Sequence, residues 1–231
     1  DGIKEVPVVK PIDVDQIVVN KDQVTSSAAW NNGTKDIGTN VVDNNYATFF
    51  DGVADGYVTL DLRTEFPIAA VSFAPRSGYE SRCEDAVIYG SADGENWTEL
   101  YTVESTPAAN KDTMVYYSEF NTYKEGAEPT SYRYIKYAVG PNGACNLSEL
   151  KVYKPASDYT VEQVSGIAYP DGTLSLPKTL TLTKKDGGAT EDVNVTWNTE
   201  GVDFDAQPYT YLNLTGALEG HSDIQATATV Q

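Results

Sequence analysis

Aromatic and planar polar side chains gather in two stretches of the sequence that do not look like strands. One is SAAWNNG and the other is PRSGYESRC, and together they contribute Trp30, Asn31, Arg76, Tyr79, Glu80 and Arg82. Protein sites for sugars combine an aromatic surface for the C–H face of the ring with planar groups that hydrogen-bond its hydroxyls. These six residues are therefore a candidate carbohydrate site. In the alternative interpretation, Trp30 covers one end of the fold and Arg76 pairs with a loop acid.

A second group of residues offers the oxygen atoms that a hard cation prefers. The stretch NVVDNNYATFFD supplies the Asp43 carboxylate, the Thr48 hydroxyl and several backbone carbonyls, and Glu149 stands in an apolar setting near Leu147 and Leu150. Calcium binds about 6–8 oxygen atoms and accepts backbone carbonyls. A carboxylate among apolar neighbours costs free energy unless it is paired or bound to metal. The pattern suggests a calcium site, with an ordinary Asx turn as the alternative.

The sequence offers little for catalysis. It has a single histidine, His221, which we expect in an exposed loop, and nothing resembling a nucleophile elbow accompanies it. No glycine-rich loop of the phosphate-binding kind precedes a helical pattern. Pairs of carboxylates for glycoside hydrolysis remain open as an alternative, because 34 acidic residues form many pairs. We expect a chain that is not itself an enzyme.

The two cysteines, Cys83 and Cys145, allow two interpretations. Cys83 ends the loop that carries the arginines, and Cys145 follows the turn-forming stretch GPNGA before a late strand. If these loops are neighbours, a disulfide joins them. Two buried thiols are the alternative, because cysteine is among the most frequently buried residues.

The elements that must position these residues are short strands. Apolar and polar residues alternate over many segments separated by Gly, Asn, Asp and Pro, and no helical stripe of useful length is present. Asp93-Gly94 predicts a tight type I′ hairpin turn followed by a core Trp97. The predicted strands are 15–19, 57–62, 66–74, 87–91, 97–103, 113–120, 132–139, 147–153, 180–183, 193–197, 209–214 and 224–230. This pattern predicts an all-β protein.

The segment KPASD at 154–158 is small, polar and proline-bearing, which is typical of a linker. We expect a lead-in segment over 1–20, one β-domain over 21–155 and a smaller one over 156–231. The chain does not begin with Met, and we expect it to be a piece of a longer protein.

Charge restricts the partners. The formal net charge is −18, of which −10 falls on residues 1–155 and −8 on residues 156–231. Nucleic acids and anionic membranes bind through basic patches, so neither is an expected partner. No apolar run approaches the roughly 20 residues that span a bilayer. Neutral partners such as glycans remain, and we expect a monomer.

Three motifs, in order, resemble a known family. They are VVD followed by TFF at 41–50, PR followed by SADGENW at 75–97, and YIK followed by LSEL at 134–150. Together they resemble the coagulation factor V/VIII type C (discoidin) family, and within it the bacterial family 32 carbohydrate-binding modules. The resemblance implies an eight-stranded jelly-roll-like β-sandwich with a structural calcium ion. It implies calcium ligands from Val41, Asp43, Asn45, Thr48 and Glu149, with Val41 and Asn45 contributing carbonyls.

The same resemblance implies a shallow glycan site on loops at one end of the sandwich, often for galactose-type sugars. Arg76 matches the ligand-contacting arginine that follows a proline. Glu80 and Ser81 stand where the family usually has an asparagine, and the last loop lacks its usual aromatic residue, which Trp30 or Tyr79 could replace.

Residues 156–231 resemble a bacterial immunoglobulin-like domain through LPKT at 176–179, Asp186-Gly187, VNVTW at 193–197 and Gly216 with Gly220. Such domains are usually spacers, and Trp197 would be a core residue. We therefore expect a glycan-binding module and a spacer from a secreted or cell-surface bacterial protein, with a glycoside hydrolase as the expected parent and other modules of the same polypeptide as partners. The alternative function is a protein-binding adhesion module.

Overall fold

The computed structural model describes residues 12–140, 143–204 and 211–231, and the predicted strand at 209–214 lies partly outside them. All regular elements in these ranges are β-strands or short 3-10 helices. None of the described helices has the length and apolar character needed to span a membrane. The all-β prediction is confirmed.

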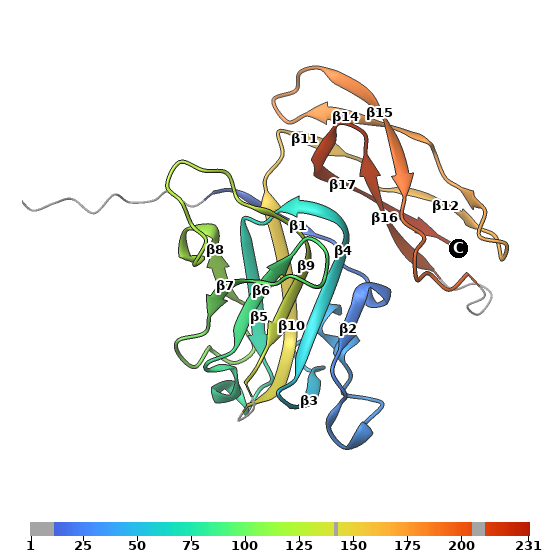
Figure 1. The fold of residues 1–231 in the computed structure, drawn as a ribbon. Helices are drawn as coiled ribbons and strands as arrows, with labels where there is room; N and C mark the ends of the chain where they lie inside the picture. Colours follow the sequence, from blue (N-terminus) through green and yellow to red (C-terminus); the bar gives the residue numbers. More distant parts are fainter. Residues whose placement is uncertain (1–11, 141–142, 205–210) are drawn as a thin grey trace, which may run out of the picture.

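Residues 14–155 form two facing sheets of five strands each, within the described residues (Figure 1). One sheet has the order β1-β10-β5-β8, with β3 also paired to β10. Its strands are β1 (Val14–Ile17), β3 (Phe50–Ala54), β5 (Ala70–Pro75), β8 (Thr113–Tyr116) and β10 (Ala144–Pro155). Residues 14–17, from the predicted lead-in, are thus paired with β10.

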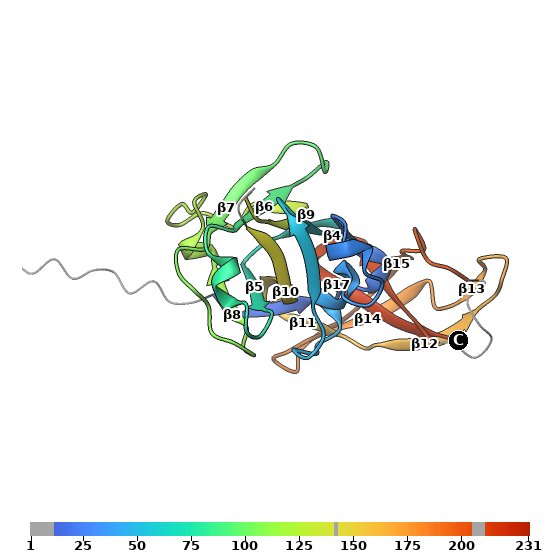
Figure 2. The ribbon, with the colours of Figure 1, turned by 90° about the horizontal axis from the view of Figure 1, so that it is seen from below.

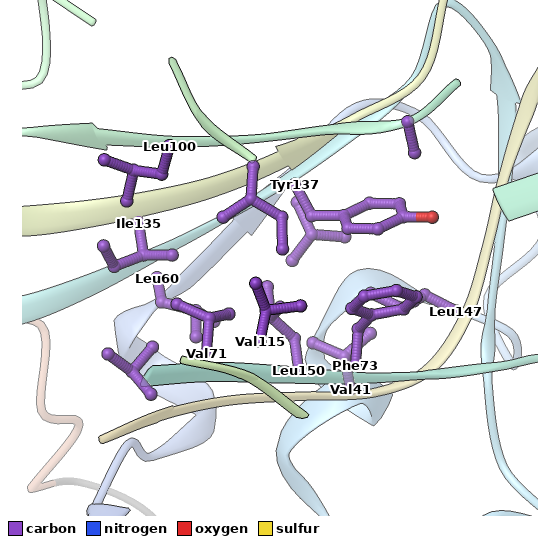
Figure 3. Close-up of a cluster of buried hydrophobic side chains, with 14 of the residues drawn as sticks. Val41, Leu60, Val71, Phe73, Leu100, Val115, Ile135, Tyr137, Leu147 and Leu150 are labelled. Carbon is purple, nitrogen blue, oxygen red and sulfur yellow. The ribbon is translucent and has the colours of Figure 1, made fainter. Parts of the chain in front are cut away.

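The other sheet has the order β2-β4-β9-β6-β7. Its strands are β2 (Val24–Ser26), β4 (Tyr57–Pro67), β6 (Val87–Ser91), β7 (Thr98–Thr102) and β9 (Ser131–Ala138). Side chains from both sheets meet in one hydrophobic core, in which Phe73, Tyr137 and Leu147 are fully buried (Figure 3). Buried positions alternate with more exposed ones over 57–63 of β4 and 134–138 of β9, as a sheet with one solvent-facing side requires.

Two local expectations in this region are wrong. Of Asp93 and Gly94, only Gly94 has a positive φ, and residues 92–97 form a wider loop in which the Asp93 carboxylate accepts hydrogen bonds from the backbone of Glu95 and Asn96. Trp97 is only half-buried, and the Nζ of Lys136 lies 3.9 Å from its ring. Lys136 occupies an outward position between buried Ile135 and Tyr137, so Trp97 packs outside the core.

Residues 159–230 contain a seven-stranded sheet of order β11-β14-β15-β16-β17-β12-β13, in which β12 runs parallel to β17. Its strands are β11 (Tyr159–Val161), β12 (Val164–Ala168), β13 (Leu174–Ser175), β14 (Thr179–Lys184), β15 (Thr190–Trp197), β16 (Leu212–Leu218) and β17 (His221–Val230). Figure 2 shows it beside the sandwich. Two small clusters of buried side chains support it, and Trp197 packs against both.

His221 does not lie in an exposed loop. It begins β17, and 17% of its side chain is exposed. Its Nε2 lies 3.4 Å from a carboxylate oxygen of Glu191, and its ring contacts that of Tyr159 edge-on. Pairing with the neighbouring strand draws the residue into the sheet, which the flanking glycine and serine do not indicate.

Candidate functional site

The predicted arginine loop begins where three adjacent strands approach one another at one end of the sandwich. β10 lies between β5 and β3, with Leu147 opposite both Pro75 and Phe50, and Asn146 opposite Asp51. The backbone N–H of Arg76 donates to the carbonyl of Asn146, 3.3 Å away. The register therefore brings Arg76, Asp51 and Asn146 together, although they are distant in the sequence.

Polar side chains at this end form a connected network. Arg76 Nη1 lies 2.8 Å from Asp51 Oδ2, and Asn146 Nδ2 donates to Asp51 Oδ1 at 2.7 Å. Arg82 Nη1 donates to Asn146 Oδ1. Each planar group is thereby fixed by its neighbour, and Arg76 and Asp51 keep 19% and 22% of their side chains exposed. A rigid, partly exposed network of this kind can exchange hydrogen bonds with a ligand.

Aromatic rings hold the guanidinium groups in place. The Arg76 Cζ lies 4.1 Å from the ring centres of both Phe49 and Tyr79, and the Arg82 Cζ lies 4.3 Å from that of Tyr79. Cation–π contacts at such distances are attractive. With two guanidinium groups against its ring, Tyr79 helps to position the arginines, and 37% of the residue remains exposed.

Glu80 stabilises the loop itself. Its Oε1 accepts a hydrogen bond of 2.8 Å from the backbone N–H of Gly78, which has a φ of +85°. That hydrogen bond lowers the pKa of the Glu80 carboxyl below its usual value. Glu80 is therefore a charged residue at neutral pH that supports the conformation of the loop carrying Tyr79 and Arg82.

Trp30 and Asn31 lie on the neighbouring segment η2 (Trp30–Asn32). The preceding Ala29 forms a β-bridge with Gly52, the residue after Asp51, so this segment borders the strand that holds the network. The Trp30 side chain is 59% exposed. Asn31 is also exposed and adopts a left-handed φ of 52°, which asparagine tolerates better than most residues. Trp30 is thus the freely exposed indole next to the network.

The charges of the network balance. Arg76 and Arg82 carry two positive charges, and Asp51 and Glu80 carry two negative charges. These four side chains together carry no net charge, in a domain with an overall negative charge, so they suit a neutral polar ligand better than an ionic one.

The predicted metal residues meet at a separate place, between the loop at 43–48 and β10. Thr48 Oγ1 donates to Asp43 Oδ2 at 2.7 Å and also contacts the Asn45 carbonyl at 2.8 Å. Asn45 N–H donates to Glu149 Oε1 at 2.6 Å. Val41 is buried in η3 (Gly38–Val42), just before Asp43. Four of the predicted residues are therefore hydrogen-bonded together across the loop and β10, and Val41 lies in the preceding η3.

One carboxylate oxygen of Glu149 is buried without a hydrogen bond among the described residues. Its side chain is fully buried, and its Oε2 has no hydrogen-bond donor among the described residues. Lys151 Nζ is 3.8 Å from it and is bonded to Asp112 at 2.9 Å instead. Burial raises the pKa of Glu149 to about 7, and the Asn45 N–H and Lys151 only partly oppose this. Glu149 also borders a cavity of about 110 Å³.

These donors fit a calcium ion by their chemistry, because every one is an oxygen. No cluster of three or more His, Cys, Asp and Glu side chains suited to metal occurs in the described parts of the chain. A metal here would depend on two carboxylates, a hydroxyl and backbone carbonyls together.

Both cysteines are free and buried, and the disulfide left open by the sequence is not formed. Cys83 ends η4 (Glu80–Cys83) and Cys145 lies at the start of β10, so both thiols lie beneath the candidate site. Burial raises the pKa of Cys83 to about 11 and raises that of Cys145 further. Both are thiols rather than thiolates at neutral pH and behave as core residues.

Sequence reasoning missed Phe49, Asp51 and Asn146. A signal existed for the first two, because alternate residues of a strand share a face and Phe50 points into the core. Asn146 is 1% exposed, and only the pairing of β10 with β3 and β5 reveals its role.

Comparison with solved structures finds similar β-domains. A family 62 carbohydrate-binding module from Clostridium thermocellum Xyl5A is 25% identical, covering 61% of this chain and 97% of its own, with a TM-score of 0.48. The family 32 module of C. perfringens NanJ, in complex with galactose, is 17% identical, covering 62% and 100%, with a TM-score of 0.45. The lectin domain of lectinolysin, complexed with Lewis B antigen, is 16% identical, covering 61% and 97%, with a TM-score of 0.47.

A search of curated protein sequences finds no match. A family model, by contrast, matches residues 23–150, and its description is the F5/8 type C domain. The matched residues make up more than half of the 231-residue chain. They include the loop at 43–48, the arginine loop and Glu149. The chain therefore belongs to the F5/8 type C domain family.

Proposed function

We propose that residues 12–155 form a non-catalytic glycan-binding module whose site is the end of the sandwich built from Arg76, Asp51 and Asn146. The observation that carries this proposal is the hydrogen-bonded network of these three side chains at the ends of β3, β5 and β10. It presents planar donors and acceptors in a fixed arrangement, so little side-chain entropy is lost when a ligand binds.

Trp30 completes the site as an apolar platform, since sugar rings pack their C–H faces on aromatic side chains. The balanced charges of this group of four side chains favour an uncharged sugar over an acidic one. A shallow site of this type binds weakly, and a Kd near 1 mM corresponds to about −4 kcal/mol. Such a module is effective when it is tethered, because the tether raises the effective concentration of its partner.

The wider context follows from this proposal. The module would hold a larger secreted or cell-surface bacterial protein, with a glycoside hydrolase as the leading candidate, close to its carbohydrate. Residues 156–231 would act as an immunoglobulin-like spacer. The alternating buried and exposed positions of β14 and β17 support a domain with its own small core.

A structural calcium ion belongs to the same proposal. The Asp43 and Glu149 carboxylates, the Thr48 hydroxyl and the Val41 and Asn45 carbonyls would hold it. The buried Glu149 Oε2, which accepts no hydrogen bond from the described residues, supports this assignment. When bound, calcium would neutralise the two carboxylates and fix the loop at 43–48 to β10.

A glycan array tests the proposed binding. The array should contain galactose and its derivatives together with fucosylated and glucose-based glycans. We expect the wild type to bind a neutral glycan, and we expect Arg76→Ala and Trp30→Ala to lower the signal at least tenfold. Trp97→Ala is the matched control, because Trp97 is a half-exposed tryptophan on the outer sheet face, where it contacts Lys136. Binding to no glycan, or equal binding by all variants, contradicts the proposal.

A further inference from the structure

The two halves of the chain contact one another through the segment at 15–22. The side-chain amide of Gln225 on β17 makes two hydrogen bonds with the backbone of Val18, accepting from its N–H at 2.8 Å and donating to its carbonyl at 3.0 Å. Asn20 Nδ2 donates to the carbonyl of Asn213 on β16 at 2.8 Å. Because the Gln225 amide pairs with both backbone groups of Val18, it fixes the relative orientation of the two halves at this point as well as their separation.

An ionic cluster adds to this contact. Arg63 lies in the irregular part of β4 with a φ of 67°, and only 7% of its side chain is exposed. Its guanidinium lies 3.2 Å from Asp22, 3.3 Å from Asp61 and 3.5 Å from Glu200, which belongs to the second half of the chain.

Arg133 strengthens the same cluster. It forms a two-pronged pair with Asp61 at 2.8 and 2.9 Å and also lies 3.5 Å from Glu200. Burial raises the pKa of Asp61, but the hydrogen bond from Arg133 and the Arg63 N–H outweigh it and keep the pKa below its usual value. Asp61 is therefore a carboxylate at neutral pH, and the two guanidinium groups it orients are the ones that meet Glu200.

The connection at 154–158 is also held on both sides, unlike a flexible linker. Asp15 Oδ2 accepts a hydrogen bond of 3.1 Å from the backbone N–H of Ser157 and lies 3.5 and 3.7 Å from the ammonium groups of Lys154 and Lys185. The N–H of Ala156 donates to the carbonyl of Asp13 at 2.8 Å. On the other side, the backbone N–H of Lys185 donates to the carbonyl of Asp158 at 2.8 Å, so both halves of the chain hold the connector.

We infer that the described parts of residues 159–230 are docked on the sandwich as one rigid body with it, through Gln225, Asn20 and the ionic cluster around Arg63. β10 runs from the candidate site at Ala144 to the connector at Pro155, and twelve residues in a strand span about 40 Å. The docked half therefore lies at the end of the sandwich opposite Arg76. In this position the docked half acts as a rigid support. It leaves the loops around Arg76 uncovered and directed away from the second half, whatever ligand they bind.

Distance measurements between spin labels test the docking. One label is attached to Glu125→Cys in the first half and one to Lys178→Cys in the second, both at exposed positions. The native cysteines are buried and should not react. We expect a single narrow distance distribution in the wild-type background. We expect a broad one for Glu200→Arg combined with Gln225→Ala, because the first change places a third cation beside Arg63 and Arg133.

Glu162→Arg is the matched control, since it makes the same charge change at an exposed position of the second half and should leave the distribution narrow. Circular dichroism and thermal melting establish that every variant is folded. Glu200 keeps 71% of its side chain exposed, so its replacement should not unfold either half. A broad distribution in the wild-type background, or one that stays narrow in the double variant, overturns the inference.

Discussion

At the level of single residues, Arg76 shows why one recognisable side chain predicts a site only in part. The arginine was identified from its sequence motif, but its position depends on Asp51, Phe49 and Tyr79. Asp51 in turn is bonded to Asn146, a residue 95 positions further along the chain. Contacts over such separations depend on strand register, which local sequence does not encode. The sequence indicates the residue types in this loop, but not how the chain brings Arg76, Asp51 and Asn146 together.

Glu149 gives a direct test of the calcium proposal. Calcium at about 100 times its Kd should stabilise the wild type by about 2.7 kcal/mol, which raises the melting temperature by several degrees. Glu149→Gln should lose most of this increase, because one ligand charge is removed. Differential scanning fluorimetry with and without calcium measures this increase in melting temperature. Glu162→Gln is the matched control. An equal increase in all three proteins contradicts the assignment.

The same carboxyl predicts a pH dependence in metal-free protein. Its pKa is raised by burial to about 7 in the folded state, compared with 4.5 in the unfolded chain. The folded state therefore binds more protons between these values, and stability is full below pH 4.5 and falls as pH rises through 7, by at most about 1.4 kcal/mol per pH unit.

Urea unfolding in the presence of a chelator measures this loss as the difference between pH 5 and pH 8. Glu149→Gln cannot ionise and should show a smaller difference than the wild type. Identical pH profiles for the two proteins would contradict the prediction, because they would mean that ionising Glu149 costs the folded state no free energy.

At the level of elements, the strands with strong alternation were predicted closely. β6 was predicted over its full range, and β7, β9 and β14 were predicted to within one residue at each end. The missed strands are β2, β3, β11, β12 and β13. They are at most five residues long, and they become strands only by pairing with neighbours: β2 with β4, β3 with β10, β11 with β14, β12 with β17 and β13 with β12. Their stability comes from tertiary partners rather than from their own residues.

β6 offers a prediction about packing within the sheets. A Cβ at Gly90 would lie 2.7–2.9 Å from the ring of the largely buried Tyr132, so Gly90→Ala must displace that ring. Overpacking of this kind costs about 1–3 kcal/mol. Chemical denaturation measures the loss. Gly140→Ala is the control, since no atom lies within 4 Å of the added methyl, and equal stability of the two variants would show that Tyr132 moves freely.

At the level of the whole molecule, the net charge and the candidate site both favour an uncharged polar ligand. A net charge of −18 disfavours polyanionic partners, and the charge-balanced group around Arg76 and Asp51 suits an uncharged polar ligand. Family membership fits this account, because the matched residues 23–150 include both the arginine loop and the loop at 43–48. In the docked arrangement inferred above, the second half lies toward the opposite end of β10 and leaves the loops accessible.

The most direct test of the central claim is a titration of isotope-labelled protein with the best glycan from the array, followed by amide and indole NMR shifts. The account predicts saturable shifts of the Trp30 indole, of residues 76–83 and of Asn146, and it predicts no change at Trp97. Shifts confined to the outer sheet face or to residues 159–230, or no saturable shift with any glycan, would contradict it.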